Sequence, residues 1–261
     1  MIRAAVLGSP ISHSLSPVLH KRAFEILGVA GEYSAIEVPS GHLHSFLDQE
    51  ESHGWRGFSL TMPLKEEALV ECVSLSTDSE LLKATNTIIS REQSWFGYNT
   101  DVLGFELLLQ ECDGHDVFIL GAGATARAAL LAARRSGMHT TVLRRNINRD
   151  NDLRAIDRDV EILEWEKIAE PIFSGIVINS TPAGVVTTEL RGQIQYLIDS
   201  LYHPWPTVLM SKVGARTKVF SGLNLLAAQA AYQVPLFTER EVSITELYPQ
   251  LLEVGQKIIH S

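Results

Sequence analysis

The sequence predicts an α/β protein of two domains. The chain has 261 residues, which suits one large domain or two domains of ordinary size. Short apolar runs alternate with stretches of helical spacing, an order typical of a parallel sheet with right-handed crossovers. A glycine-rich turn, Gly121-Ala122-Gly123, separates a first half with several short polar motifs from a second half of more regular strand–helix alternation.

The elements of the first hundred residues follow from their apolar spacing. Strands are expected over Ala4–Leu7, Tyr33–Val38 and Gly57–Thr61. Helices are expected over Pro17–Leu27, where Gly28 would end the helix, around His42–Glu51 and over Lys65–Cys72. Two further apolar runs with a polar segment between them predict a β-hairpin of Thr87–Ser90 and Trp95–Tyr98.

The second half continues this alternation. Helices are expected over Val102–Cys112, which links the two halves, and over the alanine-rich Thr125–Ser136, which would end at Gly137. Strands are expected over Val117–Leu120, Thr140–Leu143, Glu161–Glu164, Gly175–Asn179, Gln195–Leu201 and Thr207–Leu209. The C-terminal stretch Leu223–His260 predicts helices that break near Pro235 and Pro249.

Composition argues against several classes of protein. Hydrophobic residues make up 45% of the chain and charged residues 20%, as in ordinary globular proteins. The net charge of −9 argues against a nucleic-acid partner, because polyanions require a basic surface. No apolar stretch approaches the ~18–20 residues that span a bilayer. The N-terminal apolar run is too short for a signal peptide, so we expect a cytoplasmic protein. We further expect a monomer or a homodimer.

The cysteines and histidines give no sign of a metal site. Cys72 and Cys112 could form one disulfide, but two buried thiols are the favoured interpretation in a reducing cytoplasm. His42 and His44 lie two residues apart, which puts them on different faces of a helix. Because no histidine has the spacing of a metal site with cysteine or acidic partners, we expect no metal.

The glycine-rich turn predicts nucleotide binding. The segment Gly121-Ala122-Gly123-Ala124-Thr125-Ala126 fits the fingerprint G-x-G-x-x-G/A. The first glycine permits the tight turn, the second lets a pyrophosphate approach the backbone, and the small last residue lets the helix pack on the strand. A purely structural turn is the alternative. The strand before it and the helix after it favour a Rossmann-like domain, whose helix N-terminus would hold phosphate.

Arginines at the end of the following strand indicate which dinucleotide binds. An NAD site carries an acidic residue about twenty residues after the glycines, to bind the ribose 2′-hydroxyl. This chain has Arg144-Arg145-Asn146 there, followed by Arg149. Guanidinium groups match a 2′-phosphate, so NADP(H) is favoured over NAD(H), with a solvated basic loop as the alternative. The missing acid also argues against a methyltransferase.

Polar motifs precede the glycine-rich turn. Ser16 before Pro17 is a good helix start, with the serine as N-cap, but capping gives no reason for Ser14. Lys65 would lie in the first turn of its helix, where the dipole disfavours a cation. A solvated surface lysine is the ordinary interpretation, but this siting favours a role in proton transfer.

Two asparagine motifs complete the set. Asn86 precedes an expected strand, and Asn99-Thr100-Asp101 ends the hairpin and opens a helix, where Thr100 or Asp101 could be an ordinary N-cap.

These motifs together resemble the shikimate dehydrogenase family. The segment Ser12–Pro17 is similar to the family's S-x-S-P motif, which implies that Ser14 and Ser16 bind a substrate carboxylate. The T-x-P-x-K match at Thr61–Lys65 implies that Thr61 binds substrate and that Lys65 is catalytic. Asn86 would bind substrate, and Asp101 would pair with Lys65.

The resemblance extends over the second half. Asn179–Gly184 is similar to the family loop that covers the nicotinamide and would place Thr181 at the cofactor. Asp199–Tyr202 is similar to the segment whose tyrosine reaches substrate, so the resemblance implies that Tyr202 binds substrate and Ser200 cofactor. Two further segments, Ser221–Leu223 and Ala227–Ala231, resemble the family's closing motif. This resemblance implies that Gly222 lies near the nicotinamide and that Gln229 binds a substrate hydroxyl. A polar residue on a buried helix is the alternative for Gln229.

The resemblance implies a reversible, NADPH-dependent reduction of 3-dehydroshikimate to shikimate in aromatic amino acid (chorismate) biosynthesis. The substrate domain would comprise residues 1–101 and the returning helices 223–261, the NADP-binding domain would comprise residues 102–222, and the active site is expected between the domains. Lys65, oriented by Asp101, would transfer the proton. A quinate dehydrogenase and a non-catalytic NADP-binding regulator are the alternatives.

Three residues depart from the family's pattern. Tyr98 stands where an aspartate is common, Arg144 replaces a frequent asparagine, and Ser200 replaces a larger apolar residue. The change at Arg144 is expected to tighten NADP binding or to alter its geometry. The change at Ser200 puts a contact with the nicotinamide in doubt.

Overall fold

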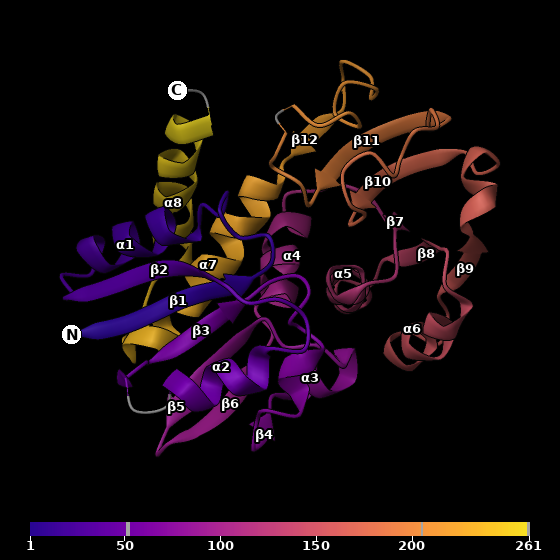
Figure 1. The fold of residues 1–261 in the computed structure, drawn as a ribbon. Coiled ribbons are helices and arrows are strands. Elements are labelled where there is room, and N and C mark those ends of the chain that lie inside the picture. Colours follow the sequence, from indigo (N-terminus) through magenta and orange to yellow (C-terminus); the bar gives the residue numbers. More distant parts are fainter. Residues whose placement is uncertain (51–52, 205, 260–261) are drawn as a thin grey trace. The chain divides into compact units, whose positions relative to one another are not determined.

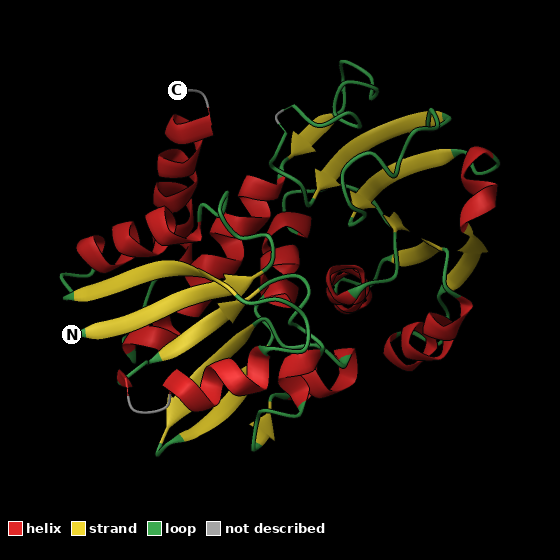
Figure 2. Cartoon of the chain, viewed as in Figure 1, coloured by secondary structure: helices red, strands yellow, loops and turns green. Residues whose placement is uncertain are grey.

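A computed structural model describes residues 1–50, 53–204 and 206–259 (Figure 1). The chain divides into two compact units, Met1–Thr100 with Leu226–Ser261, and Asp101–Leu225. Each unit contains a six-stranded sheet with helices (Figure 2). The predicted two-domain α/β class, with C-terminal helices that return to the first domain, is confirmed.

The limits of the units differ slightly from the expected domain limits. Asp101 belongs to the second unit because it is the first residue of helix α4 (Asp101–Leu109), which packs against α5 (Ala124–Arg135). Residues 223–225 also belong to the second unit, since they form the first turn of α7 (Gly222–Thr238). The chain therefore passes between the units at Thr100 and again within α7.

The first unit is built on a mixed sheet of order β2-β1-β3-β5-β6-β4. Strand β1 pairs in parallel with its two neighbours, and β5 is antiparallel to both β3 and β6. The strands are β1 (Ile2–Gly8), β2 (Gly31–Glu37), β3 (Gly57–Leu60), β4 (Ser74–Leu75), β5 (Thr87–Arg91) and β6 (Ser94–Tyr98). The predicted hairpin is thus confirmed, with a tight turn at Glu92 and Gln93, both at positive φ.

Helices cover this sheet. Helix α1 packs on β1, on β2 and against α8, next to which it is drawn in Figure 1. The α-helices of the unit, apart from α7, are α1 (Ser16–Ile26), α2 (Leu43–Glu50), α3 (Thr77–Leu82) and α8 (Ile244–Ile259). Gly28 has φ +61° and follows the end of α1, as expected. The predicted ends at Glu51 and His260 lie outside the described residues.

The second unit has an all-parallel sheet of order β12-β11-β10-β7-β8-β9. Numbered along the chain within this unit, the strands run 3-2-1-4-5-6, the Rossmann order. They are β7 (Asp116–Leu120), β8 (His139–Arg144), β9 (Glu161–Glu164), β10 (Phe173–Asn179), β11 (Gly192–Asp199) and β12 (Lys218–Phe220), accompanied by α4, α5 and α6 (Asp150–Ile156). The order reverses between β7 and β10, where ligands bind in such sheets.

Four local expectations were wrong. Residues 62–66 form turns before a short 3₁₀ helix, Glu67–Leu69, because the Lys65 carbonyl accepts from the Thr85 N–H at 2.8 Å instead of continuing a helix. Thr207–Leu209 is a turn, since the Thr207 hydroxyl oxygen accepts from the Met210 N–H at 3.2 Å. Pro235 and Pro249 lie inside α7 and α8, and the break falls between these two helices.

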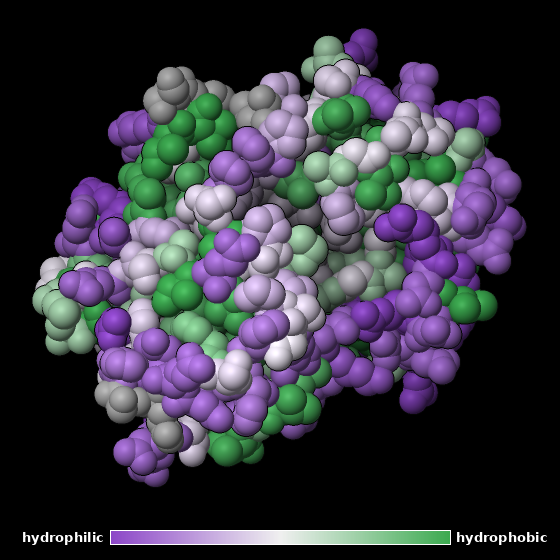
Figure 3. Space-filling model, viewed as in Figure 1, coloured by the Kyte–Doolittle hydropathy of each residue, from purple (hydrophilic) through white to green (hydrophobic). Residues whose placement is uncertain are grey.

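The surface shows hydrophobic residues in separate patches among hydrophilic ones on the face drawn in Figure 3. Within the described ranges, no helix combines the length and the apolar character needed to cross a membrane.

A histidine lies in the core of the first unit. His20 on α1 is fully buried and stacks on Tyr33, with ring centroids 4.0 Å apart. Its Nδ1 donates to the Ser16 carbonyl at 2.9 Å, which leaves Nε2 as the unprotonated nitrogen of the neutral ring. Burial lowers the pKa of His20 to about 4, although the bond to Ser16 opposes this shift.

This histidine predicts a loss of stability in mild acid. Between pH 6.5 and about 4 the unfolded chain binds a proton at His20 and the folded chain does not, so stability falls as the pH falls through that window. From pH 7 to pH 5 the free energy of unfolding should drop by about 2 kcal/mol through this group. Urea titrations at several pH values test this, and His20→Phe should lose that part of the pH dependence. An unchanged pH dependence in the variant would contradict it.

Candidate functional site

The glycine-rich loop lies at the point where the strand order of the second unit reverses. Gly121 ends β7 with φ +112°, and a Cβ there would meet the Ser180 Oγ at 2.7 Å, so both the backbone conformation and the packing require glycine. Gly123 is the N-cap of α5, and a Cβ there would meet no atom within 4 Å. This open backbone at a helix N-terminus fits a dinucleotide phosphate.

The neighbouring residues support the same fit. Ala122, Ala124 and Thr125 are partly exposed on the loop and the first turn, whereas Ala126 is fully buried, as the fingerprint requires of its last small residue. Ser180, which follows β10, donates from its backbone N–H and its hydroxyl to the Leu120 carbonyl, at 3.0 and 2.9 Å. These bonds hold the loops after the adjacent strands β7 and β10 together.

Arg127 supports the loop and was not among the residues predicted from the sequence. It is the largest fully buried side chain of the described part of the chain, and its Nη1 donates to the Ala122 carbonyl at 3.4 Å. Its position in an alanine-rich helix could have indicated this role from the sequence, because a helix face that packs on a sheet rarely carries a charge without a specific partner.

The arginines after β8 differ in their surroundings. Arg144 is buried and binds Asp150 bidentately, through Nε at 2.6 Å and Nη2 at 3.0 Å, which lowers the pKa of Asp150. Arg145 is exposed and makes no side-chain hydrogen bond or ion pair within the described residues. Arg149 lies 3.6 Å from Asp152. Asp150 thus takes up two donors of the Arg144 guanidinium, and a direct contact of Arg144 with the cofactor phosphate stays a prediction.

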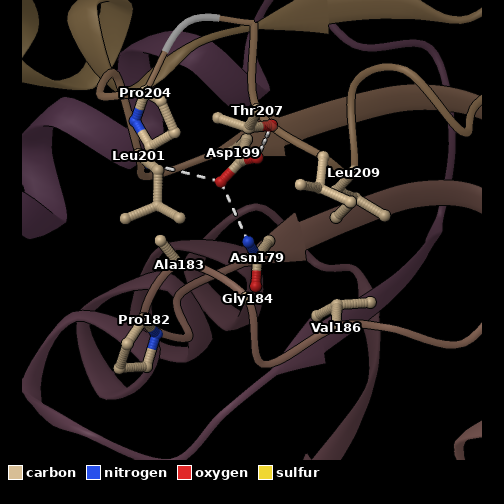
Figure 4. A pocket seen from close by; sticks show the side chains of 11 residues that line it. Asn179, Pro182, Ala183, Gly184, Val186, Asp199, Leu201, Pro204, Thr207 and Leu209 are labelled. Carbon is tan, nitrogen blue, oxygen red and sulfur yellow. Dashed lines mark hydrogen bonds between the residues drawn. The ribbon is translucent and has the colours of Figure 1, made fainter.

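Asp199, at the end of β11, connects two loops (Figure 4). Its carboxylate is fully buried and accepts from Asn179 Nδ2 at 2.9 Å, from the Leu201 N–H at 3.2 Å and from the Thr207 hydroxyl at 2.5 Å. Burial raises the pKa of Asp199, and these bonds oppose the shift. They fix the start of the loop after β10 to the segment after β11.

These two loops surround a small pocket in the second unit (Figure 4). It has a volume of about 90 Å³ and is lined by mostly apolar side chains, with Asn179, Asp199 and Thr207 as its buried polar members. Thr181 is turned toward Asn179, since its N–H and its hydroxyl both donate to Asn179 Oδ1, at 3.1 and 2.7 Å.

Three predicted residues follow β11 or open α7. Ser200 donates its N–H to the Asn179 carbonyl at 2.9 Å, and Tyr202 is partly exposed two residues later. A Cβ at Gly222 would meet the Ser200 carbonyl oxygen at 2.4 Å. Close packing between these two backbone segments therefore explains the glycine by itself.

Two of the predicted substrate residues meet in the first unit. Asn86 and Gln229 are both buried, and Asn86 Nδ2 lies 3.5 Å from Gln229 Oε1. Thr100 joins them, since its N–H donates to Asn86 Oδ1 at 2.8 Å and its hydroxyl lies 3.4 Å from Gln229 Oε1. A backbone N–H can only donate, so the amide orientation of Asn86 is determined.

The serine pair departs from expectation. Helix α1 begins at Ser16 with Leu15 as N-cap, and the Ser14 Oγ accepts the Ser16 N–H at 3.3 Å. Ser14 therefore performs the capping that was expected of Ser16. The Ser16 hydroxyl makes no hydrogen bond within the described residues, although the residue is only 3% exposed.

The predicted catalytic residues belong to different units. Lys65 is partly buried in the turn after Thr61, whose carbonyl accepts the Leu64 N–H at 2.9 Å. Because this turn is not an α-helix, Lys65 does not lie in the unfavourable field of a helix N-terminus, contrary to expectation. Asp101, the first residue of α4, is 5% exposed.

The described residues include no cluster of histidine, cysteine and acidic side chains that could hold a metal ion. The two cysteines are free thiols: Cys112 is buried and Cys72 is half-buried. Burial raises the pKa of each thiol to about 12.

Comparison with known proteins identifies the family. Residues 6–88 match the family model named "Shikimate dehydrogenase substrate binding domain". A "Shikimate dehydrogenase (NADP(+))" of Thermus thermophilus is 34% identical over 91% of this chain and 93% of its own. The chain belongs to the shikimate dehydrogenase family. A relative of the same name from Pyrobaculum islandicum is 32% identical over 95% of this chain and 97% of its own.

Solved structures agree with this membership. The shikimate dehydrogenase of Mycobacterium tuberculosis has a TM-score of 0.85 at 30% identity and covers 97% of this chain and 99% of its own. The Thermus thermophilus enzyme in complex with NADP(H) and shikimate has a TM-score of 0.84 at 31% identity, with coverage of 97% and 100%. The family predicted from the motifs is thereby confirmed.

The different surroundings of the arginines predict different effects of their removal. Arg145→Ala should raise KM for NADP⁺ by about 10–100-fold and leave KM for NAD⁺ nearly unchanged, because a charge-assisted hydrogen bond contributes roughly 1.5–3 kcal/mol. Arg144→Ala should lower thermal stability, since it leaves Asp150 without its partner, and should raise KM for NADP⁺ as well, because the freed carboxylate would repel the 2′-phosphate. Steady-state kinetics with both cofactors and thermal denaturation separate the two effects. Equal loss with NADP⁺ and NAD⁺ in Arg145→Ala would make this a solvated loop.

The serine geometry predicts a second separation. Ser14→Ala should lower the free energy of unfolding by about 1 kcal/mol, because the Ser16 N–H loses its acceptor. Both Ser14→Ala and Ser16→Ala should raise KM for shikimate, but Ser16→Ala should do so with little change in stability. Urea denaturation and kinetics of both variants check this, and a stability loss confined to Ser16→Ala would reverse the assignment.

Proposed function

We propose that this chain catalyses the reversible, NADPH-dependent reduction of 3-dehydroshikimate to shikimate, within chorismate biosynthesis. The observation that carries the proposal is the buried cluster of Asn86, Thr100 and Gln229 in the unit that contains the family's substrate-binding segment. The names and the complex of the relatives support the choice of substrate and cofactor.

In the proposed substrate site each side chain binds the substrate group that matches its hydrogen-bonding chemistry. Ser14 and Ser16 would bind the substrate carboxylate, and the unpartnered hydroxyl of Ser16 supports this role. Asn86 and Gln229 would bind ring hydroxyls, with Asn86 Nδ2 as donor because its Oδ1 already accepts from Thr100. Thr61 and Tyr202 are further substrate contacts that we propose from the family motif.

The proposed proton transfer involves two groups. Lys65 would give and take the proton of the substrate oxygen, and Asp101 would be the carboxylate that keeps its ammonium in position. NADP(H), when bound, supplies or accepts the hydride. The loop Gly121–Ala126, with Arg145 and Arg149, would hold its phosphates, while Thr181, Ser200 and Gly222 would lie toward its nicotinamide end. We keep a cytoplasmic location and a monomeric or homodimeric state as predictions.

Lys65→Ala tests the proposal. It should lower kcat for shikimate oxidation by ~10²–10⁴-fold, because it removes a general acid–base group, and leave NADP⁺ binding nearly intact. Lys257→Ala is the control, since Lys257 is an exposed α8 lysine that pairs with Glu253 on the same helix and should keep wild-type activity. Rates and NADP⁺ affinity should be measured for both.

The wild type decides between the candidate functions. Oxidation of shikimate and quinate, each with NADP⁺ and NAD⁺, should be fastest for shikimate with NADP⁺. Comparable rates with quinate would favour the broader dehydrogenase. No turnover of either substrate would favour a regulator that binds NADP.

A further inference from the structure

A buried glutamine connects the core of the first unit to Asn86. Gln233 lies on α7, is completely buried, and belongs to none of the motifs discussed above. Its Oε1 accepts from the Ser59 hydroxyl at 2.7 Å and its Nε2 donates to the Thr87 hydroxyl oxygen at 2.8 Å. One side chain thus contacts strands β3 and β5.

The orientation of this amide follows from its neighbours. Nε2 lies 3.4 Å from the Asn86 backbone carbonyl, which can only accept. On the other side the Tyr33 hydroxyl donates to Ser59 at 2.5 Å, so the single Ser59 proton is directed to Gln233 Oε1. Nitrogen therefore faces Thr87 and oxygen faces Ser59.

This orientation determines what Thr87 can do. A hydroxyl has one proton, and because Thr87 accepts from Gln233 its own proton goes to Asn86 Oδ1, at 2.8 Å. Asn86 Oδ1 also accepts the Thr100 N–H. The bonds from Thr87 and Thr100 fix Asn86 Oδ1 on the side of these two donors. The amide nitrogen Nδ2 then faces the Thr100 hydroxyl and Gln229 Oε1.

We infer that Gln233 is a positioning residue of the substrate site, which acts through the Thr87 hydroxyl to keep the Asn86 amide in its donor orientation. The inference rests on the proposed function, in which Asn86 donates to a ring hydroxyl of shikimate. Gln233 itself contacts no substrate in this arrangement. Its contribution is to substrate affinity and not to the chemical step.

Two variants and their combination test the inference. Gln233→Met keeps the length of the side chain but removes the amide, and Thr87→Val removes the hydroxyl at nearly constant volume. Each should raise KM for shikimate about 3–10-fold, the effect of one neutral hydrogen bond, with kcat and KM for NADP⁺ within about twofold of wild type. Because Gln233 acts through Thr87, the double variant should show no more than the larger single effect.

Tyr33→Phe is the matched control. It removes the donor to Ser59, but the Ser59 hydroxyl can still donate to Gln233 Oε1 and the Asn86 carbonyl still directs Gln233 Nε2 toward Thr87. Tyr33→Phe should therefore lower thermal stability without raising KM. Gln233→Glu adds a pH readout. Its carboxyl can donate to Thr87 only while protonated, so KM should be near wild type at low pH and rise with pH. Because the His20 ring is also a hydrogen-bond partner of Gln233, this profile is measured in the His20→Phe background, where no imidazole titrates beside the carboxyl.

The outcomes are distinct. An unchanged KM in both single variants, additive effects in the double variant, or an equal rise in Tyr33→Phe would overturn the inference. If Gln233→Met does not fold, Thr87→Val and the pH profile of Gln233→Glu still decide it. Failure of the proposed function is separate, because the wild type itself would then not oxidise shikimate with NADP⁺.

Discussion

The buried N–H of Thr100 needs an acceptor, and the arrangement of the first unit's polar residues depends on how that need is met. A buried donor without a partner costs roughly 1–3 kcal/mol, so the Asn86 oxygen that lies 2.8 Å away cannot easily be displaced. The backbone of Asn86 is equally committed, through bonds from its N–H to the Tyr98 carbonyl and from the Leu60 N–H to its own carbonyl. The amide nitrogen of its side chain donates to the Thr100 hydroxyl at 3.0 Å and lies 3.5 Å from Gln229 Oε1, so a ligand hydroxyl could replace the longer of these two contacts.

In the second unit the buried side-chain acceptor is a carboxylate, that of Asp199. Asp199 accepts from three donors on two segments, and each donor would lose a partner if the acid were removed. Asn179 extends the arrangement, since its nitrogen is held by Asp199 and its oxygen by Thr181. In both units a buried side-chain acceptor at a strand end therefore fixes a loop that regular secondary structure does not reach.

Local features were predictable from the sequence. The fingerprint Gly121–Ala126 and the end of α1 at Gly28 each depend on conformations that a few adjacent residues impose. The parallel sheet of the second unit was predictable from strand–helix alternation, because crossovers between parallel strands are right-handed, but the strand order came only with the structure. The family's motifs were equally readable, since each spans only a few consecutive residues.

The errors had distant or competing causes. The carbonyl of Lys65 bonds to Thr85, twenty residues away, and no local pattern announces this. Ser16 was assigned the cap because Pro17 follows it, whereas Ser14 reaches the same N–H from two residues earlier. Gln233 sits in an apolar helix, and its partner Ser59 lies 174 residues away, so only the fold could reveal its role.

The charge balance after β8 explains why a chain with an acid in this region can still prefer a phosphorylated ribose. An acid near the end of that strand would favour an unmodified 2′-hydroxyl, and Asp150 lies six residues after Arg144. Arg144 occupies both oxygens of that carboxylate, so its positive charge and the negative charge largely cancel. The exposed guanidinium of Arg145 then remains as a cation without a protein partner in the described chain. In the proposed cofactor site Arg144 would therefore favour NADP(H) indirectly, because it neutralises the acid that would otherwise repel the 2′-phosphate.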